Sequence, residues 1–158
     1  MKKVLSIIGI ILIASGKLFS QGYYNHVWLL GSYYFPQNPK GRIEFDSISY
    51  SHSIEYRKMP FVGTEATICD AQGDFKMSSN GIWIANANND TMLNGAGLNP
   101  SGITSSWPYG LPMISNALFL PFCGDSNKYM LIHHTGELLG NALVTSELLR
   151  SVIDLSQD

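Results

Sequence analysis

Charged side chains are scarce in this chain. Asp, Glu, Lys and Arg make up 14% of the 158 residues, against about 25% in an ordinary globular domain. The formal net charge is −2 and the isoelectric point lies near 6.0. A chain without a basic field has little to attract phosphate groups, so the composition argues against nucleic acid and anionic membrane surfaces as partners.

Motifs of known catalytic chemistry are also lacking. The sequence has no G-x-S-x-G, H-E-x-x-H, C-x-x-C, P-loop or G-x-G-x-x-G pattern. The neighbouring His133 and His134 would point to opposite faces of a strand, so they cannot hold one metal together. We therefore predict a protein that is not an enzyme, with no catalytic, cofactor-binding or metal-binding residues and no cofactor.

Long apolar runs are limited to the start of the chain. A lysine pair precedes the apolar run Val4–Ala14, and small residues follow it. This is the order of a secretory signal peptide, and a run of about 11 residues is short of the roughly 20 that span a bilayer. We predict a signal peptide over residues 1–21, a mature domain over residues 22–158 with no further membrane span, and a location outside the cell or on its outer surface.

Cysteine is rare as well, with Cys69 and Cys123 as the two representatives. In an oxidising compartment they could form a disulfide, but their spacing says nothing of the distance between them. The alternative, two separately buried thiols that each lie at a strand end, stays open.

Tyr, Phe, Trp, Ser, Asn and Gly are plentiful, which favours strands and turns over helices. The clearest pattern comes from two strand-like runs, Thr64–Cys69 and Phe75–Ser78, on either side of the turn-forming tetrad Asp70–Gly73. A third run, Ile82–Ala85, follows an Asn-Gly pair. The sequence predicts three consecutive antiparallel strands here.

Further strands are predicted before this meander. The segment Val27–Phe35 is rich in aromatic and β-branched residues, with a glycine where a bulge could form. From Arg42 to Tyr56 apolar and polar residues alternate, which predicts half-buried strands. His52 falls on the apolar side of this pattern, so we expect it to be packed or hydrogen-bonded rather than to bind a ligand.

Two more apolar runs, Ala117–Cys123 and Lys128–His133, are joined by turn formers and predict a buried hairpin. In the last part, Gly136–Asp158, the spacing of the leucines predicts a short amphipathic helix. A strand is predicted after it, at Arg150–Leu155.

The segment Asn99–Pro112 contains three prolines and is predicted to have no regular structure. Long loops in compact domains are often functional, and this one carries two aromatic residues, Trp107 and Tyr109. We predict that these two form a ligand-contact loop. The alternative is that they fold back as a lid over the core.

Several of these segments, taken in order, resemble a known family. They are V-W-L-L-G, A-T-I-C-D-x-x-G-D-F, N-G-I-W-I-A-N, M-L-N-G-A-G-L-N, L-x-L-P-x-x-G-D-S-N-K-Y-M-L-I-H and S-V-I-D-L. The order resembles the N-terminal part of large secreted proteins of the Bacteroidetes type, which are similar to kelch- or WD-like β-propellers. Many of those proteins end in a type IX secretion sorting domain, which does not follow here.

The resemblance implies an all-β chain of antiparallel meanders that form about two to three propeller-like blades in an incomplete arc. A β-sandwich is the alternative. Because a propeller closes with about four to eight blades, the chain is expected to be a fragment with open strand edges that can self-associate edge to edge.

The leading functional hypothesis is a non-catalytic binding or adhesion module, secreted or on the cell surface, whose partner is a glycan or a surface protein. One alternative is the propeller fragment of a secreted glycoside hydrolase, for which Asp70 and Glu65 are the carboxylates to test. Another is a structural element of a surface or gliding apparatus.

Overall fold

The computed structural model describes residues 22–31 and 35–157. The predicted signal peptide over residues 1–21 and part of the predicted first strand, residues 32–34, lie outside the described residues. Within the described part of the chain, no helix is long and apolar enough to cross a membrane.

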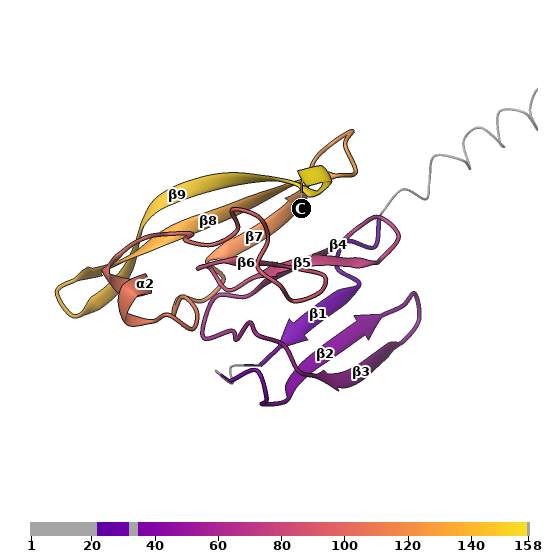
Figure 1. Cartoon of the computed structure of the whole chain (residues 1–158), viewed down its shortest axis with the longest axis horizontal. Helices are drawn as coiled ribbons and strands as arrows, with labels where there is room; N and C mark the ends of the chain where they lie inside the picture. The colour runs from indigo at the N-terminus through magenta and orange to yellow at the C-terminus, as the bar shows by residue number, and fades with distance from the viewer. Residues whose placement is uncertain (1–21, 32–34, 158) are drawn as a thin grey trace, which may run out of the picture.

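The described residues form three antiparallel sheets of three strands each, and each sheet is a meander of consecutive strands (Figure 1). The prediction of an all-β chain of antiparallel meanders is confirmed. The sheets lie in chain order, because β4 of the second sheet contacts β1 of the first and β7 of the third. The strands are β1 (Val27–Leu30), β2 (Lys40–Phe45), β3 (Tyr50–Glu55), β4 (Ala66–Cys69), β5 (Phe75–Ser79), β6 (Ile84–Asn86), β7 (Ala117–Pro121), β8 (Lys128–Leu139) and β9 (Ala142–Asp154).

The predicted hairpin of the second sheet is confirmed, and Asp70 holds its turn. One oxygen of its carboxylate, Oδ1, accepts hydrogen bonds from the backbone N–H groups of Gln72 at 2.9 Å and Asp74 at 3.0 Å. Gly73 has a φ of +95°, a conformation that favours glycine. The other oxygen, Oδ2, lies 2.7 Å from the Lys76 ammonium. Local sequence therefore fixes this turn.

The third strand of this sheet, β6, starts two residues later than predicted. Asn80 Oδ1 accepts hydrogen bonds from the N–H groups of Ile82 and Trp83, at 3.1 and 3.3 Å, and so extends the turn. The other edge of β6 is covered by the loop that follows. The Ile84 N–H donates to Gly95 O at 2.8 Å, and the Leu98 N–H donates to Ile82 O at 2.8 Å.

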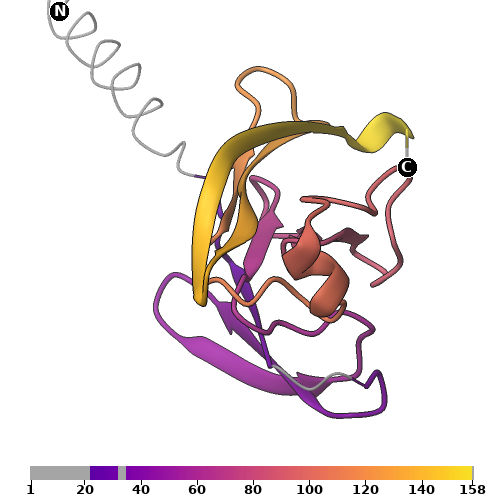
Figure 2. The ribbon, with the colours of Figure 1, turned by 90° about the vertical axis from the view of Figure 1, so that its left-hand side faces the viewer.

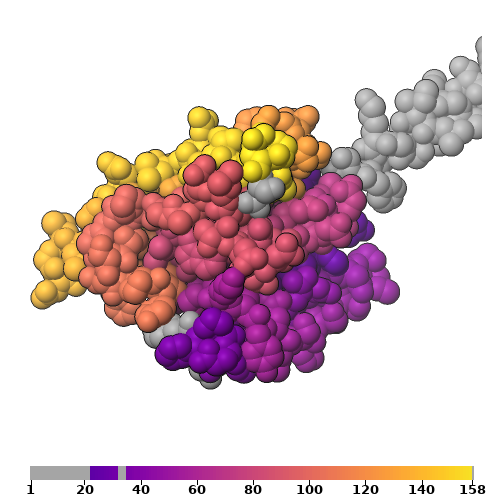
Figure 3. Space-filling view, viewed as in Figure 1, coloured from indigo at the N-terminus to yellow at the C-terminus, as the bar shows by residue number. Residues whose placement is uncertain are grey.

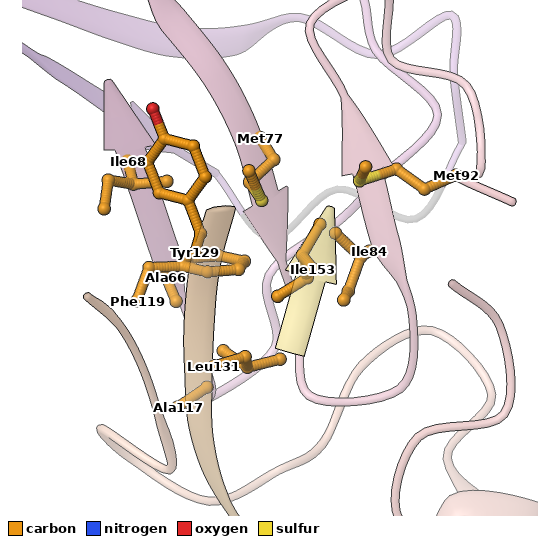
Figure 4. Packing of buried hydrophobic residues seen from close by; sticks show 10 residues of the cluster. All are labelled: Ala66, Ile68, Met77, Ile84, Met92, Ala117, Phe119, Tyr129, Leu131 and Ile153. Atoms are coloured by element: carbon orange, nitrogen blue, oxygen red, sulfur yellow. The ribbon is translucent and has the colours of Figure 1, made fainter. Parts of the chain in front are cut away.

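The second sheet is buried on both faces. Successive side chains of a strand point to opposite sides, so Ile84 packs toward the third sheet while Ala85 packs toward the first. Figure 4 shows the larger of the two clusters, where Met77 and Leu131 are fully buried. This cluster contains Ala66, Ile68, Met77, Ile84, Met92, Ala117, Phe119, Tyr129, Leu131 and Ile153. The cluster between the first and second sheets contains Val27, Leu29, Met59, Phe61, Cys69 and Ala85.

The third sheet confirms the predicted β7–β8 hairpin and overturns the predicted helix after Gly136. The hairpin was predicted to be buried, but one side of it is exposed, with Leu118 and Leu120 in water. β8 continues to Leu139, and β9 pairs with it along most of its length, with Leu138 opposite Leu143. Figure 2 shows this long, curved pair at the outside of the molecule. The two-residue turn Gly140-Asn141, with Gly140 at a φ of +63°, reverses the chain where a helix would need to continue. The strand predicted at Arg150–Leu155 is correct as the end of β9.

The segment Asn99–Pro112 contains a short helix, α2 (Gly102–Ser106), where no regular element was predicted. Ser101 and Thr104 form a reciprocal capping box, with side chain to backbone distances of 3.3 and 2.9 Å. Buried Ile103 anchors the helix against Leu111 and Met113. On the side seen in Figure 3, the segment between β6 and β7 lies over the middle of the molecule, between the first and third sheets.

β2 is half-buried, as predicted, but β3 is exposed along nearly its whole length, which overturns the prediction of a half-buried strand from Tyr50 onward. The apolar residues of β3 face outward. Tyr50 and Ile54 of β3 are 68% and 69% exposed, and Ile48 and Tyr56 are also exposed. His52 is exposed too, so the expectation that it is packed is wrong. The alternation is real, but its apolar residues share a side with Trp28 and Leu30, opposite to the side on which Val27 and Leu29 pack against the second sheet.

An ionic network around Arg57 explains this reversal. Arg57 is 1% exposed, and its guanidinium lies 2.7 Å from Glu55 Oε1. Nearby, the Arg42 guanidinium lies 3.6 Å from Glu55 Oε2 and 5.6 Å from the ring centre of Phe75 in the second sheet. Burial lowers the pKa of Arg57, while the carboxylate of Glu55 opposes that shift. The inner side of β2 and β3 is thus filled by paired charges.

Candidate functional site

The outer side of the first sheet is an uncharged aromatic surface, which we call the front face. In the strand register Trp28 lies opposite Ile43, and Ile43 lies opposite His52. The rings of Trp28 and Phe45 meet edge to face with centroids 5.0 Å apart. These strand positions hold no Asp, Glu, Lys or Arg, and His52 is the basic side chain among them. The front face consists of Trp28, Leu30, Ile43, Phe45, Tyr50 and Ile54.

The outer side of the third sheet is also apolar, and we call it the back face. Leu118 lies opposite Ile132, and Leu120 lies opposite Met130, which in turn lies opposite Val152. Leu118 and Val152 are more than half exposed. Arg150 lies opposite Ile132 and brings one positive charge to this surface. The back face consists of Leu118, Leu120, Met130, Ile132 and Val152.

Both faces are unusual because a sheet normally buries its apolar side. The chain has buried each face of the second sheet and one face of each outer sheet. Contiguous apolar surface left in water marks an interaction site on a soluble protein. The two faces are therefore the candidate functional surfaces.

The predicted contact residues Trp107 and Tyr109 lie just after α2 and are 45% and 47% exposed. Their loop is fixed at its base, since Asn80 Nδ2 donates to Tyr109 O at 3.3 Å and the Leu111 N–H donates to Asn80 O at 2.9 Å. This exposure is compatible with a contact loop, and less so with a lid over the core.

The two cysteines are free, so the possible Cys69–Cys123 disulfide is not formed. Cys69 is buried at the end of β4, in the cluster between the first and second sheets. Cys123 is exposed, two residues beyond β7, which corrects the alternative of two buried thiols. Burial raises the pKa of Cys69 and keeps it in the thiol form.

The carboxylates suggested for glycoside hydrolysis are differently placed. Burial alone would raise the pKa of Asp70, but Lys76 and the turn N–H groups outweigh it and lower the pKa. An acid that holds its proton near neutral pH needs the opposite shift. Burial raises the pKa of Glu65, against the nearby positive charge of Arg57. Among the described residues, no three His, Cys, Asp or Glu side chains gather where they could hold a metal ion.

A chain of hydrogen bonds that the sequence did not reveal links Ser151, His133 and Asn99. His133 Nε2 lies 3.0 Å from Ser151 Oγ, and His133 Nδ1 lies 2.6 Å from Asn99 Oδ1. Asn99 Nδ2 donates to Gly81 O at 2.8 Å, so Asn99 Oδ1 is the acceptor and His133 Nδ1 carries the proton. Nε2 is then free to accept the serine proton. Burial, and secondarily His134, lower the pKa of His133.

Ser151 also lines a cavity of about 250 Å³ between the end of β9 and the loop after β6. Ile84, Met92 and Gly95 line the opposite side. A nucleophile, a neutral base and a residue that orients the base are thus hydrogen-bonded in a row, and the nucleophile, Ser151, lines the cavity. The same bonds also tie β8, β9 and the loop at Asn99 together, which is a stabilising role that needs no chemistry.

A second cavity, of about 240 Å³, lies between the turn at Asp70 and the β7–β8 turn. Its charges are already paired. Lys76 lies 2.7 Å from Asp70, and Lys128 lies 2.9 Å from Asp125. The cavity therefore offers little free charge to a ligand.

Comparisons with models of known protein families, with curated proteins and with solved structures found no match. The arguments about function therefore rest on the sequence and on the surfaces described above.

Proposed function

We propose that this chain is a non-catalytic binding module of a secreted or cell-surface protein, and that the front and back faces are its binding surfaces. The observation that carries the proposal is that both outer sheets leave an apolar face in water while the sheet between them is covered twice. The export of the chain is supported by the apolar run Val4–Ala14 after a lysine pair.

We also propose that the three sheets are blades of a β-propeller-like arrangement, as the family resemblance implies. Two features support it: each sheet is an antiparallel meander, and the first strands β1, β4 and β7 are the ones that meet. The sheets have three strands, whereas a propeller blade has four. Front and back are then the sides on which neighbouring blades would pack.

The test is retention of the exported, purified chain on outer-membrane fractions of a Bacteroidetes-type bacterium, the source that the family resemblance implies. Glutamate at two front positions, Tyr50→Glu with Ile54→Glu, should lower retention at least about tenfold because a charge cannot be buried cheaply. Ile114→Glu is the matched control, since Ile114 is 88% exposed and lies outside both faces. Equal retention of all three proteins would contradict the proposal.

A glycan-array measurement on the same proteins separates a glycan partner from a surface protein. Binding to defined glycans that is lost with the front-face variant assigns a carbohydrate partner to that face. Binding that depends instead on Trp107 and Tyr109 moves the site to the loop after α2.

The chain of Ser151, His133 and Asn99 favours a second candidate function, hydrolysis of a small ester. In that reaction Ser151 Oγ bonds to the carbonyl carbon as His133 Nε2 takes its proton and then passes it to the leaving alkoxide. Water, deprotonated by the same nitrogen, then releases the acid and restores the serine. A fluorophosphonate probe should label Ser151, with loss in Ser151→Ala and none in Ser53→Ala. No labelling of the folded chain leaves the three residues with their structural role.

A further inference from the structure

Each sheet has a front side, which faces the preceding sheet in chain order, and a back side, which faces the following one. Each contact between sheets in this chain therefore joins the back of one sheet to the front of the next. The first sheet packs on the second with Val27 and Leu29, the inner residues of β1. The second sheet packs on the third with Ile68 and Met77. Within residues 22–31 and 35–157, two sheet surfaces remain without a partner, the front face of the first sheet and the back face of the third. They are the two ends of one directional stack.

We infer that the partner of these faces is a second copy of this chain, bound head to tail, with the back face of one copy on the front face of the other. The inference rests on the proposed function, because it names the partner of the same two surfaces. A second copy has a back face that can cover the front face of the first copy, and a front face that can cover its back face. The contact repeats the kind of packing that already joins the sheets within the chain.

Charge supports this partner over an ionic one. The strand positions of the front face hold no Asp, Glu, Lys or Arg, and Leu118, Leu120 and Met130 make much of the back face apolar. An acidic or basic ligand would find almost no opposite charge on the front face. Two cations lie on the outer side of the third sheet. Lys128 pairs with Asp125, whereas Arg150 can stack on an aromatic ring such as that of Trp28.

The available area fits a contact that is made twice. On the front face, Trp28, Tyr50 and Ile54 are 49%, 68% and 69% exposed, so together they offer on the order of 400 Å². A specific interface buries about 1,200 to 2,000 Å² in total over both partners. A head-to-tail pair that closes on itself forms the contact twice and reaches this range. Closure would give a ring of six sheets, whereas a rotation that does not close would give an open filament.

The test is the mass of the exported chain in solution, measured by light scattering and sedimentation velocity between about 1 and 100 μM. We expect two copies, or an open series of larger species. A front-blocked variant, Tyr50→Glu with Ile54→Glu, and a back-blocked variant, Leu118→Glu with Val152→Glu, should each be monomeric. Their association should weaken at least about 100-fold, since a charge is placed in each contact. Ile114→Glu should associate like the unmodified chain.

Mixing the two blocked variants gives the sharpest result. The front-blocked copy keeps its back face, and the back-blocked copy keeps its front face. We therefore expect a one-to-one pair that grows no further and that is weaker than the closed pair, because it forms the contact once. A symmetric front-to-front contact would instead leave the back-blocked variant dimeric, and the mixture would gain nothing. Circular dichroism and melting of each variant show that it remains folded.

A monomeric unmodified chain at 100 μM overturns the inference. If that monomer still loses retention on outer-membrane fractions when its front face is blocked, the binding function survives with another partner. If retention is also unchanged, both proposals fail.

Discussion

Replacing Arg57 is the sharpest test of our explanation for the outward-facing apolar side of the first sheet. The Arg57 guanidinium reaches all three strands of that sheet. Nη2 donates to Leu30 O at 2.6 Å, and Nη1 donates to Gly41 O at 3.3 Å and Glu55 Oε1 at 2.7 Å. The group also lies 5.0 Å from the ring centre of Phe61. Within the described residues, Nε has no hydrogen-bond partner.

Arg57→Met keeps most of the apolar stem and removes the charge and its hydrogen bonds. Breaking a buried ion pair costs about 3 to 5 kcal/mol, because the partner is left without its counter-charge. The side chain of Glu55 is 22% exposed and can regain some water, so we expect the lower end, about 3 kcal/mol. In a domain of this size that corresponds to a fall in melting temperature of about 6 to 12 °C.

The matched control is the next residue in the chain. The side chain of Lys58 is 64% exposed and pairs with Asp90 in water, so Lys58→Met should cost less than about 1 kcal/mol. Urea unfolding followed by tryptophan fluorescence and by circular dichroism measures both variants. If Arg57→Met costs no more than Lys58→Met, the network does not hold the sheet together, and our explanation of the exposed front face is wrong.

Three further predictions concern single sites. Gly63→Ala should destabilise the fold by more than about 1 kcal/mol, because the added methyl would lie 2.7 Å from the carbonyl carbon of Pro112. In Gly102→Ala, the control, the added methyl meets no atom within 4 Å, so the change should be neutral or stabilising. Urea unfolding measures both variants. A thiol reagent should react with one cysteine, Cys123, in the folded chain and with a second only in denaturant, because Cys69 is buried and its pKa is raised. Rapid reaction of both thiols in the folded chain would refute this. Burial lowers the pKa of His133 below its ordinary 6.5, so the unfolded chain takes up the proton first as the pH falls. The stability that the neutral, buried His133 contributes is therefore present above pH 6.5 and lost below it. His133→Gln should reduce the loss of unfolding free energy between about pH 7.5 and 5.5, and an unchanged slope would contradict the shift.

Local signals in the sequence predicted most of the strands. The turn at Asp70 needs only residues within four positions of one another, and the structure has it as predicted. The hairpin at Gly140-Asn141 had an equally local signal, a glycine followed by asparagine between two apolar runs. It was missed because the spacing of the leucines fits a helix as well as a pair of strands.

The candidate surfaces could not be predicted from local patterns. Alternation from Arg42 to Tyr56 shows that the two sides of the strands differ, but the buried side is decided by Arg57, which pairs with Glu55 beneath the sheet. The hydrogen bonds of His133 join it to residues 34 positions before it and 18 positions after it in the chain. No short sequence motif records contacts between residues that are so far apart in the chain.

The central claim is that the middle sheet is covered on both sides, while the first sheet leaves its front face open and the third sheet its back face. Hydroxyl-radical footprinting of the dilute chain tests this most directly, with the labelling of each residue measured by mass spectrometry. We expect rapid labelling of Tyr50 and Leu118 and protection of Met77 and Leu131. Protected Tyr50 and Leu118 in a monomer, or Met77 labelled as fast as they are, would contradict the arrangement of the sheets on which every proposal here depends.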